Sequence, residues 1–185
     1  IYELGYKHIF SNSATRAGYS GVVSLCDFEC TSAKCECADD SEGRVLEHRF
    51  KDIVLFNIYF PNGQKDELRL AYKMKFYADF LLYLKDLLAK GKKIIICGDV
   101  NTAHKELDLT HPKANANTSG FLPIERAWID ELLGAGFIDT FRAINGDDGH
   151  SGICGCHPAV CARRRALQLV GLQDRGAPTQ CGLAD

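Results

Sequence analysis

Long hydrophobic runs are missing from this sequence of 185 residues. No stretch approaches the roughly 18 consecutive apolar residues that indicate a membrane-spanning helix. The chain also does not open with the charged and apolar segments of a signal peptide. We therefore expect a soluble globular protein with no membrane partner. Its first residue is Ile1 in place of methionine, which predicts that the chain is a fragment whose true start lies upstream.

An excess of charge of one sign is also missing. The chain has 22 Lys and Arg residues against 24 Asp and Glu residues, which gives a formal net charge of -2. A local basic stripe can lie on a neutral protein, so this balance neither favours nor excludes a nucleic-acid partner. With 46% apolar residues, the chain can bury a core and is about one domain long.

Cysteine, in contrast, is abundant for a reduced cytosolic enzyme, with nine residues. They form two clusters and one position in an apolar strand: Cys26, Cys30, Cys35 and Cys37; Cys154, Cys156, Cys161 and Cys181; and Cys97. The first cluster ends in a Cys-x-Cys pair, which is not the usual Cys-x-x-Cys knuckle, and no second knuckle with histidine follows at finger spacing. Zinc is therefore a minor alternative for this cluster. Disulfides are not expected without secretion signals.

Hydrophobic periodicity predicts alternating strands and helices. We expect strands over residues 18–25, 44–50 and 53–60, with an irregular Cys/Asp/Ser stretch between the first two. A helix over 67–88 follows, because apolar residues recur there at three- and four-residue steps. This stripe consists of Leu68, Tyr72, Phe76, Phe80, Leu84 and Leu87. The next strand, over 92–97, completes a strand-helix-strand unit that pairs its strands in parallel or across a wider sandwich layer.

The remaining chain up to residue 142 predicts a polar loop, a helix and a short strand. The loop spans 107–120. The helix opens at Pro123 and closes near Gly134, with Ile129, Leu132 and Leu133 facing inward. A short strand over 137–142 completes the pattern.

The most informative segment is Gly98-Asp99-Val100-Asn101-Thr102-Ala103-His104, at the end of the apolar strand that we expect to be buried on both faces. In α/β folds, chemistry is placed at the carboxyl ends of strands. Asp99 and Asn101 point the same way if the extended geometry persists. One interpretation is a strand-end turn with local side-chain hydrogen bonds. The other is a phosphodiester site, in which a carboxylate activates water, an amide fixes the carboxylate and a divalent cation neutralises the phosphate.

Tyr59 ends the preceding apolar strand, before the turn Pro61-Asn62-Gly63. A tyrosine in that position is ordinarily a core residue whose hydroxyl reaches the rim. A phenol at the rim also suits a hydrogen bond to a phosphoryl oxygen. Tyr59 alone does not decide between these roles.

Seven short motifs, taken together, are more specific. They are Gly18-Tyr19-Ser20-Gly21-Val22, Glu42-Gly43-Arg44-Val45, Tyr59-Phe60-Pro61-Asn62, Gly98-Asp99-Val100-Asn101-Thr102-Ala103-His104, Glu106-Leu107-Asp108-Leu109, Gly120-Phe121-Leu122-Pro123-Ile124-Glu125-Arg126 and Asp139-Thr140-Phe141-Arg142. In order and spacing, they resemble the exonuclease III family of apurinic/apyrimidinic (AP) endonucleases. The resemblance covers residues 18–142, apart from the cysteine-rich insert.

This resemblance implies a partial four-layered α/β sandwich of the endonuclease/exonuclease/phosphatase type. It also implies cleavage of double-stranded DNA 5′ to abasic sites with Mg²⁺ or Mn²⁺, and it leaves open a 3′→5′ exonuclease activity. By resemblance, Asp99 handles the attacking water, Asn101 helps to orient it, and Tyr59 contacts the scissile phosphate. Asp99 and Asn101 would also be secondary metal ligands. The positions expected to touch the DNA backbone are Tyr19, Arg44, Asn62 and Asn115.

The resemblance also implies a monomer, and a bacterial cytoplasm fits it. The family's first third, with an early Asn and the Glu that is its main metal ligand, has no counterpart before Ile1, and its final Asp-His motif is absent. We therefore expect an incomplete domain over residues 1–148. Two alternatives stay open: a related phosphoesterase acting on inositol phosphates, sphingomyelin or RNA ends, and a catalytically incomplete fragment that at most binds DNA.

The sequence after His150 turns to cysteine, arginine and glycine without a clear period. Read one nucleotide later, the codons of residues 166–185 permit His-Tyr-Ser-Trp-Trp-Asp-Tyr-Lys-Thr and, further on, Asn-Val-Gly-Trp-Arg, which resembles the family's next block. We therefore predict a frameshift between Gly149 and Ala166. Residues 149–185 would then be an aberrant, poorly ordered tail, and the second cysteine cluster would carry no chemistry.

Overall fold

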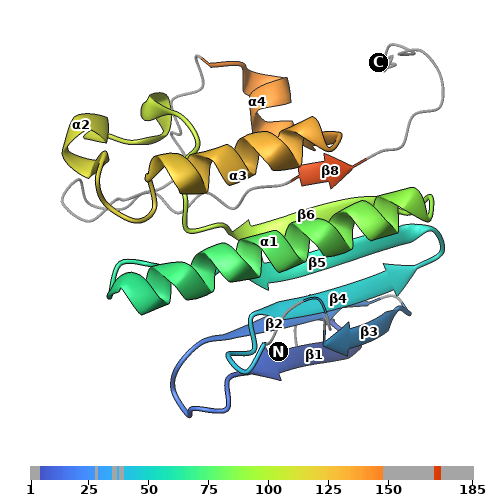
Figure 1. Ribbon diagram of the computed structural model, residues 1–185. Coiled ribbons are helices and arrows are strands. Elements are labelled where there is room, and N and C mark those ends of the chain that lie inside the picture. The colour runs from blue at the N-terminus through green and yellow to red at the C-terminus, as the bar shows by residue number, and fades with distance from the viewer. Residues whose placement is uncertain (1–4, 28, 35–36, 38–39, 148–168, 172–185) are drawn as a thin grey trace.

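Two sheets and a layer of helices make up the computed structural model, which describes residues 5–27, 29–34, 37, 40–147 and 169–171 (Figure 1). The first sheet is an antiparallel hairpin of β1 (His8–Ser13) and β2 (Gly21–Cys26). The second has six strands in the order β3-β4-β5-β6-β8-β7. Their bounds are β3 Thr31–Lys34, β4 Val45–Phe50, β5 Ile53–Tyr59, β6 Lys93–Asp99, β7 Phe137–Asp139 and β8 Leu169–Gly171. The architecture is α/β.

The long helix α1 (Glu67–Ala89) connects β5 to β6 and begins at a well-formed cap. The Asp66 side chain accepts a hydrogen bond from the Arg69 backbone N–H at 2.7 Å, which satisfies one of the helix's unpaired donors. The predicted stripe packs into the core from Phe76 onward. Leu68, in the first turn of the helix, does not: it is 83% exposed.

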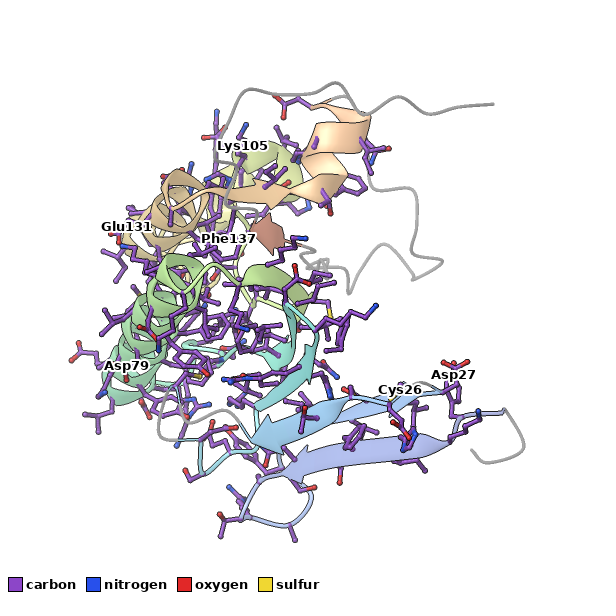
Figure 2. All side chains as sticks on the ribbon, turned by 90° about the vertical axis from the view of Figure 1, so that its right-hand side faces the viewer. Cys26, Asp27, Asp79, Lys105, Glu131 and Phe137 are labelled. Carbon is purple, nitrogen blue, oxygen red and sulfur yellow. The ribbon has the colours of Figure 1, made fainter. Side chains whose placement is uncertain are left out.

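The core lies between α1, α3 (Pro123–Gly134) and one face of the six-stranded sheet. Its centre is aromatic: the Phe60 ring makes edge contacts with Phe76, Tyr77 and Phe80, and the Trp128 indole N–H donates to the Tyr77 carbonyl at 2.8 Å. Such edge-to-face pairs add to the stabilisation by area burial. Figure 2 shows α1 on one side of the central strands and the β1–β2 hairpin on the other.

This one-sided packing corrects the prediction that the strand before Asp99 is buried on both faces. In β6, Ile94 and Ile96 are buried, whereas Ile95 and Cys97 are only half-buried. The helices cover the first pair, and the second pair lies on the face directed away from them. Strands β5 and β6 are parallel, with Tyr59 opposite Asp99, so the parallel alternative for this unit is confirmed.

Further differences concern short elements. Strands β1 and β3 were not predicted. The polar loop contains a 3₁₀ turn, η2 (Glu106–Asp108), and a short helix, α2 (Pro112–Asn115). The strand predicted over 137–142 ends at Asp139, because the Asp139 side chain accepts from the Arg142 backbone N–H at 3.0 Å and caps helix α4 (Thr140–Asn145).

The predicted tail falls mostly outside the described residues, so its poor order stays a prediction. Only the backbone of β8 is described there, paired antiparallel with β6 and β7. Of the helices in the described residues, none combines the length and the apolar character needed to cross a bilayer.

Candidate active site at the carboxyl ends of two parallel strands

The register of β5 and β6 places Tyr59 and Asp99 side by side at one edge of the sheet. The chain continues in the same pairing, since the Phe60 N–H donates to the Asp99 carbonyl at 2.9 Å. Gly98 makes this approach possible: a Cβ there would lie 1.8 Å from the Ile58 carbonyl oxygen, and its φ of +136° is unfavourable for other residues. The two predicted catalytic side chains therefore come from neighbouring strand ends.

The extended geometry stops at Asp99. Asn101 has a φ of +54°, in the left-handed region that asparagine tolerates better than most residues. Its backbone N–H donates to Asp99 Oδ1 at 2.9 Å, and its side-chain Nδ2 donates to the Phe60 carbonyl at 2.7 Å. The local turn predicted as the simpler interpretation is thus present. The backbone N–H of Asn101, and not its amide group, fixes the carboxylate in this structure.

A buried lysine on α1 forms hydrogen bonds to the loop that follows Asp99. Lys73 Nζ on α1 donates to the Asn101 carbonyl at 2.8 Å and to Thr102 Oγ1 at 2.8 Å. It also forms an ion pair with Glu125 Oε1 at 2.6 Å, and both side chains are 0% exposed. Burial lowers the pKa of Lys73, and the Glu125 carboxylate opposes that shift. This contact joins α1 to the candidate catalytic loop.

Glu125 extends the network to the motif that begins at Gly120. Its Oε2 accepts from the backbone N–H groups of Gly120 at 2.6 Å and Leu122 at 3.0 Å, and its Oε1 accepts from Ser119 Oγ at 2.7 Å. A buried carboxylate satisfied in this way rigidifies the groups around it. Two of the seven motifs are therefore physically coupled through Lys73.

Beside Tyr59 lies an open cavity of about 320 Å³. Its lining consists of Gly18, Tyr19, Ser20, Arg44, Tyr59, Asn62, Lys65 and Arg69. Three of the four predicted DNA-contacting residues are in this set. The three cationic side chains make the wall suitable for a polyanion.

Arg44 is only 3% exposed, and its guanidinium is largely engaged within the chain. Its Nη1 donates to the Tyr59 carbonyl at 2.9 Å, and its Cζ lies 4.8 Å from the centroid of the Tyr59 ring. Glu42 bridges Arg44 and Arg69 with contacts of 2.6 and 2.7 Å. Arg44 thus orients the Tyr59 ring in addition to lining the cavity.

Burial raises the pKa of Glu42, but hydrogen bonds from Arg69 and Arg44 outweigh it, so the net pKa of Glu42 is lowered. Glu42 is therefore ionised at neutral pH and holds both arginines. Tyr19, in contrast, is 47% exposed at the cavity wall.

Asn115 is the predicted DNA contact that does not line this cavity. It lies in α2, where its Nδ2 donates to the His111 carbonyl at 2.8 Å. Sequence reasoning also missed cavity and scaffold residues, chiefly Lys65, Arg69, Lys73 and Glu125. After the Asn62 turn, cationic residues recur every four positions, at Lys65, Arg69 and Lys73. This helical spacing was the sequence signal that could have identified them.

The later motifs also meet in space. Arg142 Nη2 forms an ion pair with Asp108 Oδ1. The other carboxylate oxygen of Asp108 accepts from the His104 backbone N–H at 3.1 Å, and Arg126 Nε donates to the His104 carbonyl at 2.8 Å. These contacts form a second support for the loop that follows Asn101.

The described residues only partly fit a divalent cation. Asp99 and Asn101 offer carboxylate and amide oxygens, which suit a hard ion. Within the part of the chain that the structure describes, no group of three or more His, Cys, Asp or Glu side chains is placed to hold a metal. These two residues alone therefore do not make a complete site.

Comparison with known proteins gives a consistent result. The sequence profile of the Endonuclease/Exonuclease/phosphatase family matches residues 8–173. The zebrafish (Danio rerio) protein named DNA repair nuclease APEX1 is 39% identical over 150 residues, which cover 79% of this chain and 48% of the relative. The exodeoxyribonuclease of Bacillus subtilis (strain 168) is 36% identical over 143 residues, covering 76% of this chain and 56% of the relative. The chain thus spans about half the length of these relatives.

Two solved structures share the fold. A variant of the Neisseria 3′ phosphatase NExo, bound to a product DNA hairpin, has a TM-score of 0.74 at 21% identity, and the match covers 92% of this chain and 68% of the other. An AP endonuclease from Archaeoglobus fulgidus has a TM-score of 0.73 at 21% identity, with coverages of 91% and 67%. At this identity, the likeness establishes the fold of the chain.

Proposed function

Since the chain belongs to the endonuclease/exonuclease/phosphatase family, we propose that it carries part of the active site of a DNA repair hydrolase of the exonuclease III type. The family and the fold predicted from the seven motifs are confirmed. The proposed reaction is cleavage of the phosphodiester 5′ to an abasic site in double-stranded DNA. The names of the zebrafish, Bacillus and Archaeoglobus relatives support this assignment.

One observation carries the proposal: Tyr59 and Asp99 meet at paired strand ends beside a cavity lined by Arg44, Lys65 and Arg69. Lys65, whose side chain is 83% exposed, would contact the DNA backbone, while Arg44 and Arg69, both paired with Glu42, shape the wall beside it. Tyr19 and Asn62 line the same wall and would contact neighbouring phosphates.

In the proposed mechanism, the Asp99 carboxylate orients water and takes its proton as the water attacks phosphorus. The Asn101 N–H fixes that carboxylate, and the Lys73–Glu125 pair holds the loop in place. The Tyr59 phenol donates to a non-bridging phosphoryl oxygen, where negative charge accumulates. A divalent cation, Mg²⁺ or Mn²⁺, would neutralise that charge when bound, with Asp99 and Asn101 as two of its ligands.

The test uses a DNA duplex with one stable abasic analogue and a matched duplex with an ordinary nucleotide at that position. We expect the longer protein that contains this chain to incise only the abasic strand, on its 5′ side, and to lose activity in EDTA. Equal cleavage of both duplexes, or turnover of inositol phosphates or RNA ends alone, would instead place the protein in another branch of the family.

The 185-residue chain is tested beside the longer protein in the same assay. Duplex binding without incision would identify the chain as a partial site. We further propose a monomer in a bacterial cytoplasm. The Bacillus relative supports the bacterial source, and light scattering of the purified protein tests the monomeric state.

A further inference from the structure

A second cavity, of about 330 Å³, shares no lining residue with the first. It lies on the face of the sheet directed away from α1, where Leu55 of β5 and Cys97 of β6 contribute to its wall. Cys26, Cys30 and His48 also line it. Figure 2 shows Cys26 at the end of β2, on the opposite side of the sheet from α1. No part of the proposed DNA chemistry uses these groups.

The two thiols are close enough to react with each other. Cys26 Sγ and Cys30 Sγ are 4.0 Å apart, and both residues are reduced and half-buried. A disulfide bond is about 2.05 Å long, so side-chain rotation in the loop after β2 has to close about 2 Å.

His48 completes a nucleophile-and-base arrangement. Its Nδ1 lies 3.9 Å from Cys30 Sγ, and its Nε2 lies 2.8 Å from Ser24 Oγ. Asn57 Nδ2 donates to the same Ser24 oxygen at 3.0 Å and so fixes the hydroxyl. In the tautomer with hydrogen on Nε2, the ring donates to Ser24 and presents the Nδ1 lone pair to Cys30. A base oriented by a third group is the signature of an activated nucleophile.

Burial keeps both Cys30 and His48 neutral at rest, so the thiolate forms only when His48 removes the proton during the reaction. Burial lowers the pKa of His48, which keeps the imidazole neutral and able to accept a proton. Burial, together with the contact to Cys26, raises the pKa of Cys30. The resting thiol therefore keeps its proton, and its reactivity depends on the neighbouring base.

We propose that Cys30, Cys26 and His48 form a peroxide-reactive dithiol site. His48 Nδ1 takes the proton of Cys30, and the thiolate attacks one oxygen of a hydroperoxide, which breaks the O–O bond. The departing alkoxide or hydroxide takes that proton back from His48 and leaves as an alcohol or water. Cys30 becomes a sulfenic acid. Cys26 then attacks the Cys30 sulfur, forms the disulfide and expels the hydroxyl as water. Two thiols are oxidised to one disulfide while the peroxide is reduced.

Metal binding explains this cluster less well. Among the residues that the structure describes, no group of three or more His, Cys, Asp or Glu side chains is placed to hold an ion. A thiol pair in contact, with a single base beside one of its members, matches redox chemistry.

The test uses the full 185-residue chain, reduced and then treated with hydrogen peroxide. We expect the intact mass to fall by two hydrogens and to recover with dithiothreitol. Chymotrypsin cuts after Phe28, between the two cysteines, so the disulfide would keep the two halves joined. A disulfide that instead links Cys97, or oxidation spread evenly over all thiols, would overturn the assignment.

Variants separate the roles. Cys26→Ser should leave a Cys30 sulfenic acid that dimedone traps, and Cys30→Ser should abolish both products. His48→Asn should slow oxidation at least ten-fold, because general bases typically contribute about 10² or more. The matched control is Cys97→Ser, which removes a thiol from the same cavity and should leave the rate unchanged. Circular dichroism confirms folding, and an unchanged rate in a folded His48→Asn variant would refute the role of the base.

Discussion

At the scale of single residues, Asp99 and Tyr59 occupy the positions where hydrolysis is proposed. In the longer protein, Asp99→Asn and Tyr59→Phe should each lower the rate of abasic-site incision by about 10² to 10⁴, because each removes a group that acts on the attacking water or the charged phosphate. Single-turnover incision assays measure the effect. Tyr6→Phe, at an exposed tyrosine, is the control. Rates within two-fold of wild type in both variants would contradict the assignment.

Lys73 shows why part of this site was hidden from sequence reasoning. It lies next to Tyr72 in an amphipathic helix, and a lysine there ordinarily predicts solvent exposure. Its partner Glu125 is 52 residues further along the chain, and nothing local reveals the pairing. Asp99 was predictable because a strand end and its turn are encoded in neighbouring residues.

Removing only one member of the Lys73–Glu125 pair should strongly destabilise the folded chain. Lys73→Met should lower the free energy of unfolding by about 3 to 5 kcal/mol, since it leaves a buried carboxylate without its cation. Urea denaturation of the chain measures this. The double variant Lys73→Met/Glu125→Leu should recover part of the loss.

The control for this pair lies on the same helix. Lys75 and Asp79 form an exposed ion pair, with 73% and 33% side-chain exposure, so Lys75→Met should cost less than about 1 kcal/mol. Equal effects of Lys73→Met and Lys75→Met would show that the buried contact does not stabilise the fold.

Glu42 gives a pH-dependent prediction. Its pKa in the folded chain lies below the ordinary value of 4.5, so its stabilising effect is present above that pH and is lost as the pH falls through the folded value. The stability difference between wild type and Glu42→Gln should therefore be constant near neutral pH and shrink below about pH 4.5. Urea titrations at several pH values test this. A stability difference that instead grows as the pH falls would contradict the lowered pKa of Glu42.

At the scale of elements, long apolar patterns predicted the bounds of helices and strands well, and short patterns did not. The helix expected over 67–88 is Glu67–Ala89, and the strand expected over 92–97 is Lys93–Asp99. Both have strong periodicity of their own. Strand β3 has only four residues, and its antiparallel pairing with β4 brings together residues distant along the chain, so no local signal marks it.

Gly98 joins β6 to the candidate catalytic loop, and it should not tolerate a side chain. Gly98→Ala should unfold the chain or separate the two strands, because the new Cβ would lie 1.8 Å from the Ile58 carbonyl oxygen at a φ of +136°. The control is Gly134→Ala in α3, where a Cβ meets nothing within 4 Å and should stabilise the helix by about 0.5 to 1 kcal/mol. Thermal melting compares the two variants, and similar melting temperatures would contradict the strand contact.

At the scale of the whole molecule, the family match and the seven motifs do not cover the same residues. The motifs end at Arg142, whereas the match with the family profile continues to residue 173, past the predicted boundary at residue 148. Within that extension, the backbone of β8 completes the sheet between β6 and β7. The family match therefore extends beyond the last of the seven motifs.

A shift of reading frame would reconcile the family match up to residue 173 with the motifs that end at Arg142. The encoding DNA tests this prediction. Trp has a single codon, so the bases spanning Leu169 and Val170, which lie in β8, must spell TGG TGG when read one position later. The same offset must give Asn-Val-Gly-Trp-Arg at residues 180–184. The Trp in this run, the third in the shifted frame, again permits only one codon. Any other bases at these positions would refute the shift. If the bases agree, restoring the frame should produce the family's next block from Ala166 onward, and the restored protein should then incise abasic DNA faster than this chain.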